Sequence, residues 1–310
     1  MAKTDHAPSV SSERPQDGDV LSSLVTLRVL DEHLVACQRD GELPFYASLQ
    51  GEEAAVLGSL LSLSAADTVF ATPRECIGAF SRGLDMEALL CQLFGKEGDP
   101  AKGRQAPGHL VAPTVKWNAA SGIAGAHLAH AAGFAWAART QGDSAIALAF
   151  FGDGATSTAD FHNGLNFAAV FGARVVFVCR NNGFARSLPV DRQTLSKELA
   201  DKAVAYGMPQ VRADGNDVFA VFDAVSSAVR RARDGDGPTL VELVTKRLED
   251  DAAACPIARL AKDSQGALDA ALGDARKRAE AAVSLALAKV RALPNAHAPF
   301  TDDVFAAPAR

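Results

Sequence analysis

Two apolar runs in the middle of the chain each end in polar residues that could bind a metal ion and a phosphate. The first run ends at Phe151 and is followed by Gly-Asp-Gly, which contains Asp153; the second ends at Cys179 and is followed by Arg-Asn-Asn-Gly, which contains Asn182. Carboxylate, carboxamide and main-chain carbonyl oxygens are the hard donors that Mg²⁺ or Ca²⁺ prefers, and octahedral Mg²⁺ completes its shell with phosphate oxygens or water. The sequence therefore predicts a site for a metal-bound diphosphate.

Two neighbouring parallel strands are needed to bring these residues together. Between the two runs, Phe161, Leu165 and Ala168 recur at the spacing of an amphipathic helix. A right-handed crossover would place the two strands side by side, so Asp153 and Asn182 would emerge at the same edge of the sheet. This strand-helix-strand unit predicts an α/β fold with a mostly parallel sheet and helices on both faces.

The same stretch resembles a known family. Residues 152–187 read GDGATSTADFHNGLNFAAVFGARVVFVCRNNGFARS. This resembles the thiamin diphosphate signature, a GDG followed by NN, and more closely the E1 alpha subunit of the 2-oxo acid dehydrogenase complexes, particularly the branched-chain type. The resemblance extends over roughly residues 20–308. It implies a thiamin diphosphate-binding fold with thiamin diphosphate and Mg²⁺ as cofactors.

The resemblance also assigns residues to the cofactor. Mg²⁺ would be held by Asp153, Asn182 and the main-chain carbonyl of Phe184. The residues expected to hold the diphosphate are Arg74, Gly154, Ala155 and Arg180. The main chain at Gly122 and Ala124 would meet the aminopyrimidine ring. His109, in the family-like segment KGRQAPGH, would be an active-site acid or base.

The chain departs from the family pattern at two places. Before Arg74 the family carries a tyrosine, and here Pro73 removes both a hydroxyl donor and a backbone N–H. After the strand expected at 239–245, the family has a Tyr-Arg pair and a long loop with a His-Ser element. This chain has Lys246-Arg247 and then LEDDAAACPIARL, about twenty residues shorter, and no histidine occurs between His162 and His297. We expect these changes to weaken binding of the cofactor.

Periodicity predicts the remaining elements around this unit. Apolar residues at helical spacing indicate helices over 20–39, 51–63, 84–94, 121–139, 195–206, 218–229 and 267–293. Short β-branched or apolar runs indicate strands over 68–71, 210–213 and 239–245. Asn216 is the expected N-cap of the helix that begins at 218, and His127 and His130 are assigned to helix packing.

Composition limits the class of protein. The 310 residues are 48% hydrophobic with a net charge of −6, and no basic stripe suggests nucleic-acid binding. Five scattered cysteines without a CxxC pair suit a reducing compartment. No stretch reads as a secretory signal or a membrane span, so a cytoplasmic location is expected. Residues 1–18, rich in Ser, Pro and charge, are expected to be a disordered tail, and 19–310 a single domain.

Three functions remain open from the sequence. The resemblance implies an E1 alpha subunit that oxidatively decarboxylates a 2-oxo acid and passes the acyl group to a lipoyl-bearing E2, together with a beta subunit in an α2β2 heterotetramer. A second possibility is a non-catalytic paralogue that acts as a scaffold or regulatory subunit. A third is a nucleotide-binding α/β protein, although GDGATS lacks the third glycine of the dinucleotide fingerprint. The substrate is open as well, because CRNNGFARS reads as branched-chain and GIAGAHLAHAAG as pyruvate-type.

Overall fold

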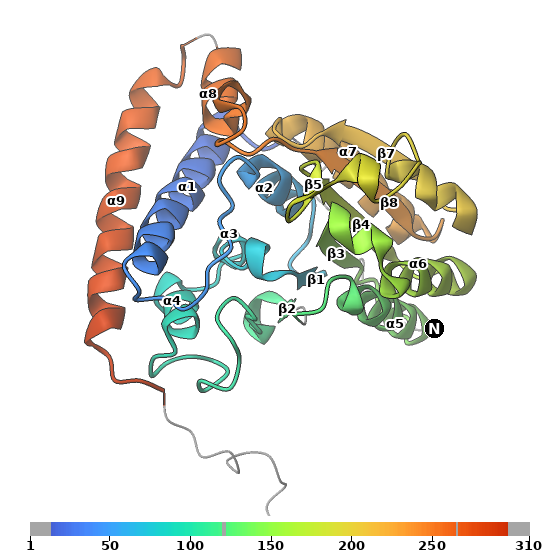
Figure 1. Cartoon of the computed structure of the whole chain (residues 1–310), viewed down its shortest axis with the longest axis horizontal. Helices are drawn as coiled ribbons and strands as arrows, with labels where there is room; N and C mark the ends of the chain where they lie inside the picture. Colours follow the sequence, from blue (N-terminus) through green and yellow to red (C-terminus); the bar gives the residue numbers. More distant parts are fainter. Residues whose placement is uncertain (1–13, 120–121, 265, 297–310) are drawn as a thin grey trace, which may run out of the picture.

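A six-stranded parallel sheet forms the centre of the molecule. The computed structural model describes residues 14–119, 122–264 and 266–296. Within these residues the strand order is β2-β1-β3-β4-β8-β7, and every neighbouring pair is parallel (Figure 1). The strands are β1 (Thr68–Ala71), β2 (Trp117–Ala119), β3 (Ala147–Gly152), β4 (Val175–Asn181), β7 (Gln210–Asp214) and β8 (Thr239–Val244). The predicted α/β fold with a parallel sheet is confirmed.

Helices cover both faces of this sheet, as predicted. The helices are α1 (Asp17–Arg39), α2 (Glu53–Leu61), α3 (Gly78–Ser81), α4 (Met86–Phe94), α5 (Ala126–Thr140), α6 (Ala159–Phe171), α7 (Val218–Asp234), α8 (Pro256–Asp263) and α9 (Asp269–Ala292). One core lies between the sheet and α5 and α6, and a second, larger core lies between the opposite face and α1, α2, α7 and α9. Along β3, Phe151 belongs to the first core and Phe150 to the second, so alternate residues fill opposite layers.

The register of the central strands positions the candidate ligands. Gly152, the last residue of β3, pairs with Arg180 of β4, so Asp153 and Asn182 follow at the same edge. β3 and the first five residues of β4 (175–179) are apolar because helices bury them on both sides. The two parallel neighbours joined by α6 are therefore the unit that the sequence predicts.

Short elements lie in the connections between the main strands and helices. After β4 the chain forms a two-stranded hairpin of β5 (Phe184–Ala185) and β6 (Leu188–Pro189). The 3₁₀ helices are η1 (Pro73–Glu75), η2 (Pro113–Val115), η3 (Asp153–Ser157), η4 (Val190–Arg192), η5 (Ala200–Tyr206) and η6 (Ala252–Ala254). Between β8 and α8 the connection contains only η6. The short connection expected from the sequence thus leads directly into α8.

Asn216 is not the N-cap of α7, contrary to the prediction. The Asp217 carboxylate caps the helix instead, because its Oδ1 accepts hydrogen bonds from the N–H groups of Phe219 (2.9 Å) and Ala220 (3.1 Å). Asn216 is buried, and its amide donates to the carbonyls of Gly51 (2.6 Å) and Lys246 (3.0 Å). A carboxamide can donate and accept at once, so Asn216 ties the loop before α2 to the exit of β8.

Three further boundaries differ from the sequence predictions. The helix expected over 195–206 is only the 3₁₀ element η5, whose first residue, Ala200, donates its N–H to the Glu242 side chain of β8 (2.8 Å). The helix expected from 121 begins at Ala126, after a turn that ends in Gly125 with φ of 82°. Helix α1 begins at Asp17, inside the tail expected over 1–18, of which residues 1–13 lie outside the described part.

Among the described residues, no helix combines the length and the apolar character needed to cross a membrane.

Candidate functional site

The ten residues predicted from the sequence surround one cavity. The cavity has a volume of about 540 Å³ and lies at the carboxyl ends of β1, β3 and β4, where open parallel sheets bind their ligands. It is lined by every candidate residue: Arg74, His109, Gly122, Ala124, Asp153, Gly154, Ala155, Arg180, Asn182 and Phe184. The structure therefore brings the whole predicted set together, while the roles of these residues stay predictions.

Among the described residues that line this cavity, Asp153 is the only carboxylate. It opens η3 directly after β3 and is buried, with 3% of its surface exposed. The amide of Gln193 donates to its Oδ2 at 3.0 Å. Burial raises the pKa of the Asp153 carboxyl above its ordinary value, because the charged form loses its hydration. A cation bound beside Asp153 would stabilise the charged form of its carboxyl group.

Asn182 is oriented from behind by a buried glutamate. Its Nδ2 donates to Oε1 of Glu52 at 2.8 Å, and its Oδ1 accepts a hydrogen bond from the N–H of Phe184 at 3.2 Å. The donor end of the amide therefore points toward Glu52. The acceptor end is fixed beside the main chain at Phe184, the residue whose carbonyl the sequence also assigns to the metal.

Arg180 is clamped between two carboxylates. Its guanidinium pairs with Glu52 through Nη1 and with Glu75 through Nη2, and all three side chains are buried. Burial alone would raise the pKa of the Glu52 carboxyl, but Arg180 and Arg74 outweigh it and hold that pKa below its ordinary value. The Nε of Arg180 is buried without a hydrogen-bond partner among the described residues. An oxyanion in the cavity would satisfy this donor.

Sequence reasoning missed Glu52. It precedes α2 and has only 1% of its surface exposed, and its carboxylate contacts Arg180, Asn182 and, at 3.9 Å, the Nε of Arg74. A signal for it existed, because Glu52 directly precedes and Glu53 opens a helix whose remaining residues are almost all apolar. A buried carboxylate requires a charged partner, so such a pair of glutamates predicts arginines nearby.

Arg74 is carried by η1 at the end of β1. Thr72 and Glu75 form a capping box around this turn, with the Glu75 carboxylate accepting from the N–H of Thr72 at 2.7 Å. Arg74 donates to the carbonyl of Ser48. Pro73 opens the turn, where its missing N–H leaves no helical hydrogen bond unmade. The residue that replaces the family's tyrosine therefore stabilises the turn that presents Arg74.

Two histidines line the cavity. The Nδ1 of His109 is buried without a partner among the described residues. His127 was assigned to helix packing alone, but it also lines the cavity, and its Nε2 lies 2.6 Å from the carbonyl of Phe150. Burial lowers the pKa of His127, so the ring is neutral and its Nε2 carries the proton donated to that carbonyl. His130, by contrast, is exposed.

The residues present fit a diphosphate better than a bare metal ion. A Cβ added to Gly154 would lie 2.7 Å from the Cβ of Ala185, so only glycine fits this turn, and the main chain stays open to a ligand. Within the described residues no three His, Cys, Asp or Glu side chains gather to hold a metal. Asp153 with neutral oxygens is a sparse ligand set, and Mg²⁺ bound here would need phosphate oxygens to complete its shell.

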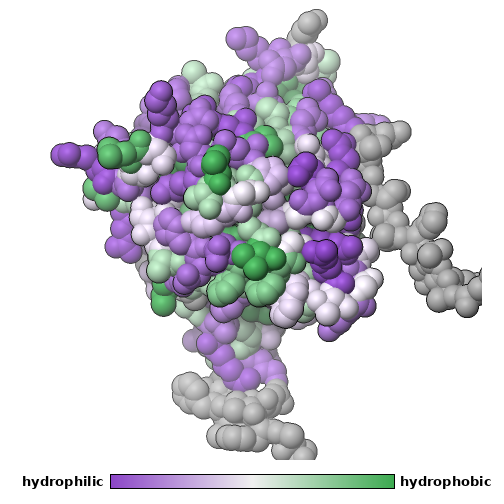
Figure 2. All heavy atoms as spheres, turned by 90° about the vertical axis from the view of Figure 1, so that its right-hand side faces the viewer, coloured by the Kyte–Doolittle hydropathy of each residue, from purple (hydrophilic) through white to green (hydrophobic). Residues whose placement is uncertain are grey.

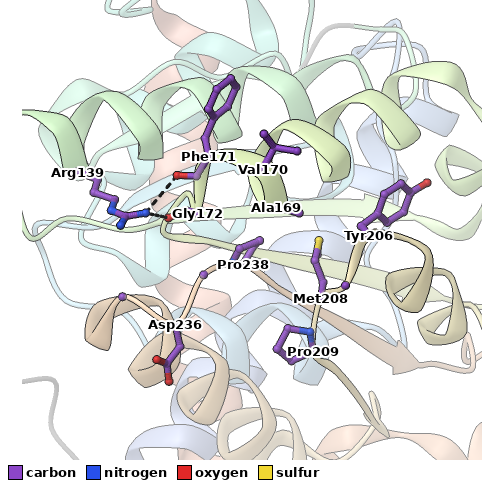
Figure 3. A pocket seen from close by; sticks show the side chains of 13 residues that line it. Arg139, Ala169, Val170, Phe171, Gly172, Tyr206, Met208, Pro209, Asp236 and Pro238 are labelled. Carbon is purple, nitrogen blue, oxygen red and sulfur yellow. Dashed lines mark hydrogen bonds between the residues drawn. The ribbon is translucent and has the colours of Figure 1, made fainter.

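A second hollow lies at the opposite edge of the sheet. It has a volume of about 560 Å³ and is bounded by the ends of α6, η5 and α7 (Figure 3). The guanidinium of Arg139 donates to the carbonyls of Phe171 (3.1 Å) and Gly172 (2.7 Å) and so caps α6. Since its one arginine is engaged with the main chain and it lies at the amino ends of the strands, this hollow is not the candidate site.

An aromatic surface lies on the outer side of α5 and α6. The rings of Trp136 and Phe171 stack with centroids 4.9 Å apart, and Phe167 stacks on Phe171 at 6.1 Å. All three are partly exposed, and 70% of the neighbouring Val170 is exposed. Figure 2 shows the side of the molecule where α5 and α6 lie: hydrophilic residues cover most of it, and hydrophobic residues gather in a small area near its middle. Exposed apolar patches of this kind mark interaction surfaces.

Comparison with known proteins agrees with this geometry. The family model described as "Dehydrogenase E1 component" matches residues 22–252. This family is thiamin diphosphate-dependent. The matched region contains all ten residues around the cavity.

Curated relatives extend the comparison. The chain is 37% identical over 232 residues to the 2-oxoisovalerate dehydrogenase subunit alpha of Bacillus subtilis, with 74% of this chain and 70% of the relative aligned. It is 42% identical over 226 residues to the 3-methyl-2-oxobutanoate dehydrogenase subunit alpha of Mycobacterium tuberculosis, covering 73% and 59%. It is 36% identical over 244 residues to the mitochondrial 2-oxoisovalerate dehydrogenase subunit alpha of Mus musculus, covering 78% and 55%. The aligned part thus spans between about half and 70% of these relatives. With a family match over most of its length and these identities, the chain belongs to the E1 alpha subunits of the 2-oxo acid dehydrogenase family.

Proposed function

We propose that this chain is the alpha subunit of a thiamin diphosphate-dependent dehydrogenase that acts on a branched-chain 2-oxo acid. The observation that carries the proposal is the gathering of all ten candidate residues around one cavity of about 540 Å³, within the size range of cofactor sites. The substrate class follows the relatives, which are named for 2-oxoisovalerate or 3-methyl-2-oxobutanoate. The pyruvate alternative has no relative of that name among those described above.

The residues divide into groups with distinct tasks. Bound thiamin diphosphate supplies the electron sink for decarboxylation, and the protein binds and orients it. Asp153, Asn182 and the Phe184 carbonyl hold Mg²⁺. The cationic and main-chain groups that hold the diphosphate are Arg74, Arg180, Gly154 and Ala155. Gly122 and Ala124 border the aminopyrimidine ring, and His109 moves a proton as acid or base.

The two departures from the family pattern are expected to lower the affinity for the cofactor. The loss of the tyrosine at Pro73 and of the loop histidine removes two contacts to the diphosphate, each worth about 1.5–3 kcal/mol. Together they correspond to a weakening of roughly two orders of magnitude or more. We therefore expect weak binding of thiamin diphosphate that requires Mg²⁺.

Titration calorimetry tests this proposal. The full chain, mixed with its beta subunit, is titrated with thiamin diphosphate in the presence of Mg²⁺ and again with EDTA. Saturable heat is expected only with Mg²⁺. Absence of heat at millimolar cofactor with the beta subunit present would contradict the proposed function and favour the scaffold alternative.

The beta subunit is proposed to pack on the aromatic surface formed by Trp136, Phe167, Val170 and Phe171. This surface belongs to α5 and α6, and the turn at Gly122 and Ala124 that precedes α5 lines the cofactor cavity. An apolar partner here would bury rings that water now reaches, at roughly 25 cal/mol per Å². An α2β2 heterotetramer and a lipoyl-bearing E2 complete the proposed assembly, and a cytoplasmic location stays a prediction.

Substitution of this surface should separate the subunits. Phe171→Arg is expected to shift the mixture of alpha and beta chains from a heteromer to free subunits in sedimentation velocity, because a charge cannot be desolvated in an apolar interface. Leu195→Arg is the matched control, since Leu195 is fully exposed and belongs to neither α5 nor α6. Equal heteromer formation by both variants would place the beta subunit elsewhere.

A further inference from the structure

A second cavity adjoins the cofactor cavity. It has a volume of about 590 Å³ and shares four lining residues with the cofactor cavity: Phe45, Ala47, Arg74 and Arg186. We call it the outer cavity. Its lining combines apolar side chains, among them Val35, Phe45 and Ala47, with three arginines, namely Arg74, Arg186 and Arg247. A cavity lined by both cationic and apolar side chains suits a small aliphatic carboxylate.

Arg186 differs from the other two arginines of this cavity in having no partner within the part of the chain that the structure describes. Arg74 donates to the carbonyl of Ser48, and Arg247 pairs with Glu249 at 2.6 Å. Among the described residues, by contrast, the side chain of Arg186 makes no ion pair or hydrogen bond. A guanidinium offers five donors in a planar fork that matches a carboxylate. Arg186 is therefore free to bind an anion that enters either cavity.

The backbone fixes Arg186 at the wall between the cavities. The residue begins the two-residue turn of the β5–β6 hairpin, and its φ of 57° lies in the left-handed region that a side chain other than glycine rarely adopts. Strained backbone of this kind is concentrated at functional sites, where the surrounding structure maintains it. The neighbouring Ala185 packs closely against Gly154, which lines the cofactor cavity.

We propose that the outer cavity is the entry subsite for the 2-oxo acid, with Arg186 binding the substrate carboxylate. Phe45 and Ala47, which line both cavities, contact the aliphatic chain of the acid. The keto group of the acid then faces the cofactor cavity. Arg247 adds positive charge beside Arg186, although Glu249 partly neutralises it. This assignment deepens the proposed function, on which it rests.

Binding of a non-reacting carboxylate tests the subsite without turnover. The probe is isovalerate, measured on the full chain by saturation-transfer NMR for the wild type, Arg186→Ala, Arg186→Lys and the control Ser187→Ala, which alters the same turn. We expect Arg186→Ala to weaken binding about tenfold or more, Arg186→Lys to restore part of it, and Ser187→Ala to match the wild type. No binding by the wild type at tens of millimolar, or equal binding by Arg186→Ala, overturns the assignment.

Calorimetry with thiamin diphosphate separates the two possible anions. If Arg186 binds the substrate, Arg186→Ala keeps the affinity for thiamin diphosphate and Mg²⁺. In the enzyme assembled with its beta subunit, the same variant raises the KM for 2-oxoisovalerate about tenfold with little change in kcat. A tenfold loss of affinity for thiamin diphosphate, with isovalerate binding intact, would instead assign Arg186 to the diphosphate and overturn the proposal. Failure of the wild type to bind thiamin diphosphate contradicts the proposed function, whereas the isovalerate result is independent of it.

Discussion

The variant Asp153→Asn is expected to lose Mg²⁺-dependent binding of thiamin diphosphate, with affinity reduced about 100-fold or more. Among the described residues that line the cavity, Asp153 is the only carboxylate, so its replacement removes the negative charge that would face the metal. Asparagine has the same shape and keeps an acceptor for Gln193, which limits any loss of structure. Titration calorimetry with and without Mg²⁺ measures the effect.

The control for Asp153→Asn is Asp191→Asn. Asp191 is an exposed carboxylate on η4, close in sequence to Gln193, so its replacement changes the net charge equally. It is expected to leave cofactor binding unchanged. Equal affinities for the wild type and Asp153→Asn would show that the metal is held elsewhere.

Asp153→Asn should also stabilise the metal-free chain against unfolding at neutral pH. The pKa of Asp153 is raised in the folded state by burial, so its contribution to stability is present below the ordinary pKa of an aspartate and is lost as pH rises through the folded pKa. Asparagine cannot ionise and avoids this loss. A higher Tm for Asp153→Asn without Mg²⁺, together with weaker cofactor binding, would identify a side chain kept for function at the expense of stability.

The sequence predicts the strand ends of this site well, because each apolar run stops where the polar residues begin. The parallel register then follows from one crossover helix, and Asp153 and Asn182 lie where the two strands leave the sheet. The buried partner Glu52 is different, since it lies 128 positions from Arg180 along the chain. Periodicity reports which face of an element is apolar, and it carries no information about which distant charge fills a given buried position.

Local turn chemistry also limits what the sequence reveals. Asn216 and Asp217 are both good N-caps, and the choice between them depends on the carbonyls of Gly51 and Lys246, which only the folded chain places nearby. The strained turn at Arg186 is likewise invisible in the sequence, because a hairpin of two-residue strands has no periodic signal. Tertiary contacts decide both cases.

Glu52 therefore offers a second test with a large expected effect. Glu52→Ala leaves Arg180 buried with only Glu75 as an ion-pair partner and removes the acceptor that orients Asn182. Removing one member of a buried ion pair typically destabilises a protein by about 3–5 kcal/mol. We expect a corresponding fall in the free energy of unfolding in urea, and a loss of affinity for thiamin diphosphate in the fraction that stays folded.

The variant Glu52→Gln distinguishes positioning from stability. Glutamine keeps an acceptor for Asn182 but loses the charge that pairs with Arg180, so cofactor affinity should fall less than in Glu52→Ala. The control is Glu87→Ala, which removes an exposed ion pair with Lys289 (2.5 Å) and should leave both quantities nearly unchanged. Full cofactor affinity in a folded Glu52→Ala protein would show that Arg180 and Asn182 need no support from this side chain.

Acid denaturation gives the final check on Glu52. The pKa of Glu52 is held below its ordinary value in the folded state, so its contribution to stability is present above the unfolded pKa of about 4.3 and is lost as pH falls through the folded pKa. Wild type should therefore lose stability below about pH 4.3 more steeply than Glu52→Gln, in which this position does not titrate. Parallel stability curves for the two proteins over that range would mean that folding does not shift the pKa of Glu52, so its pairing with Arg180 would not stabilise the charged carboxylate.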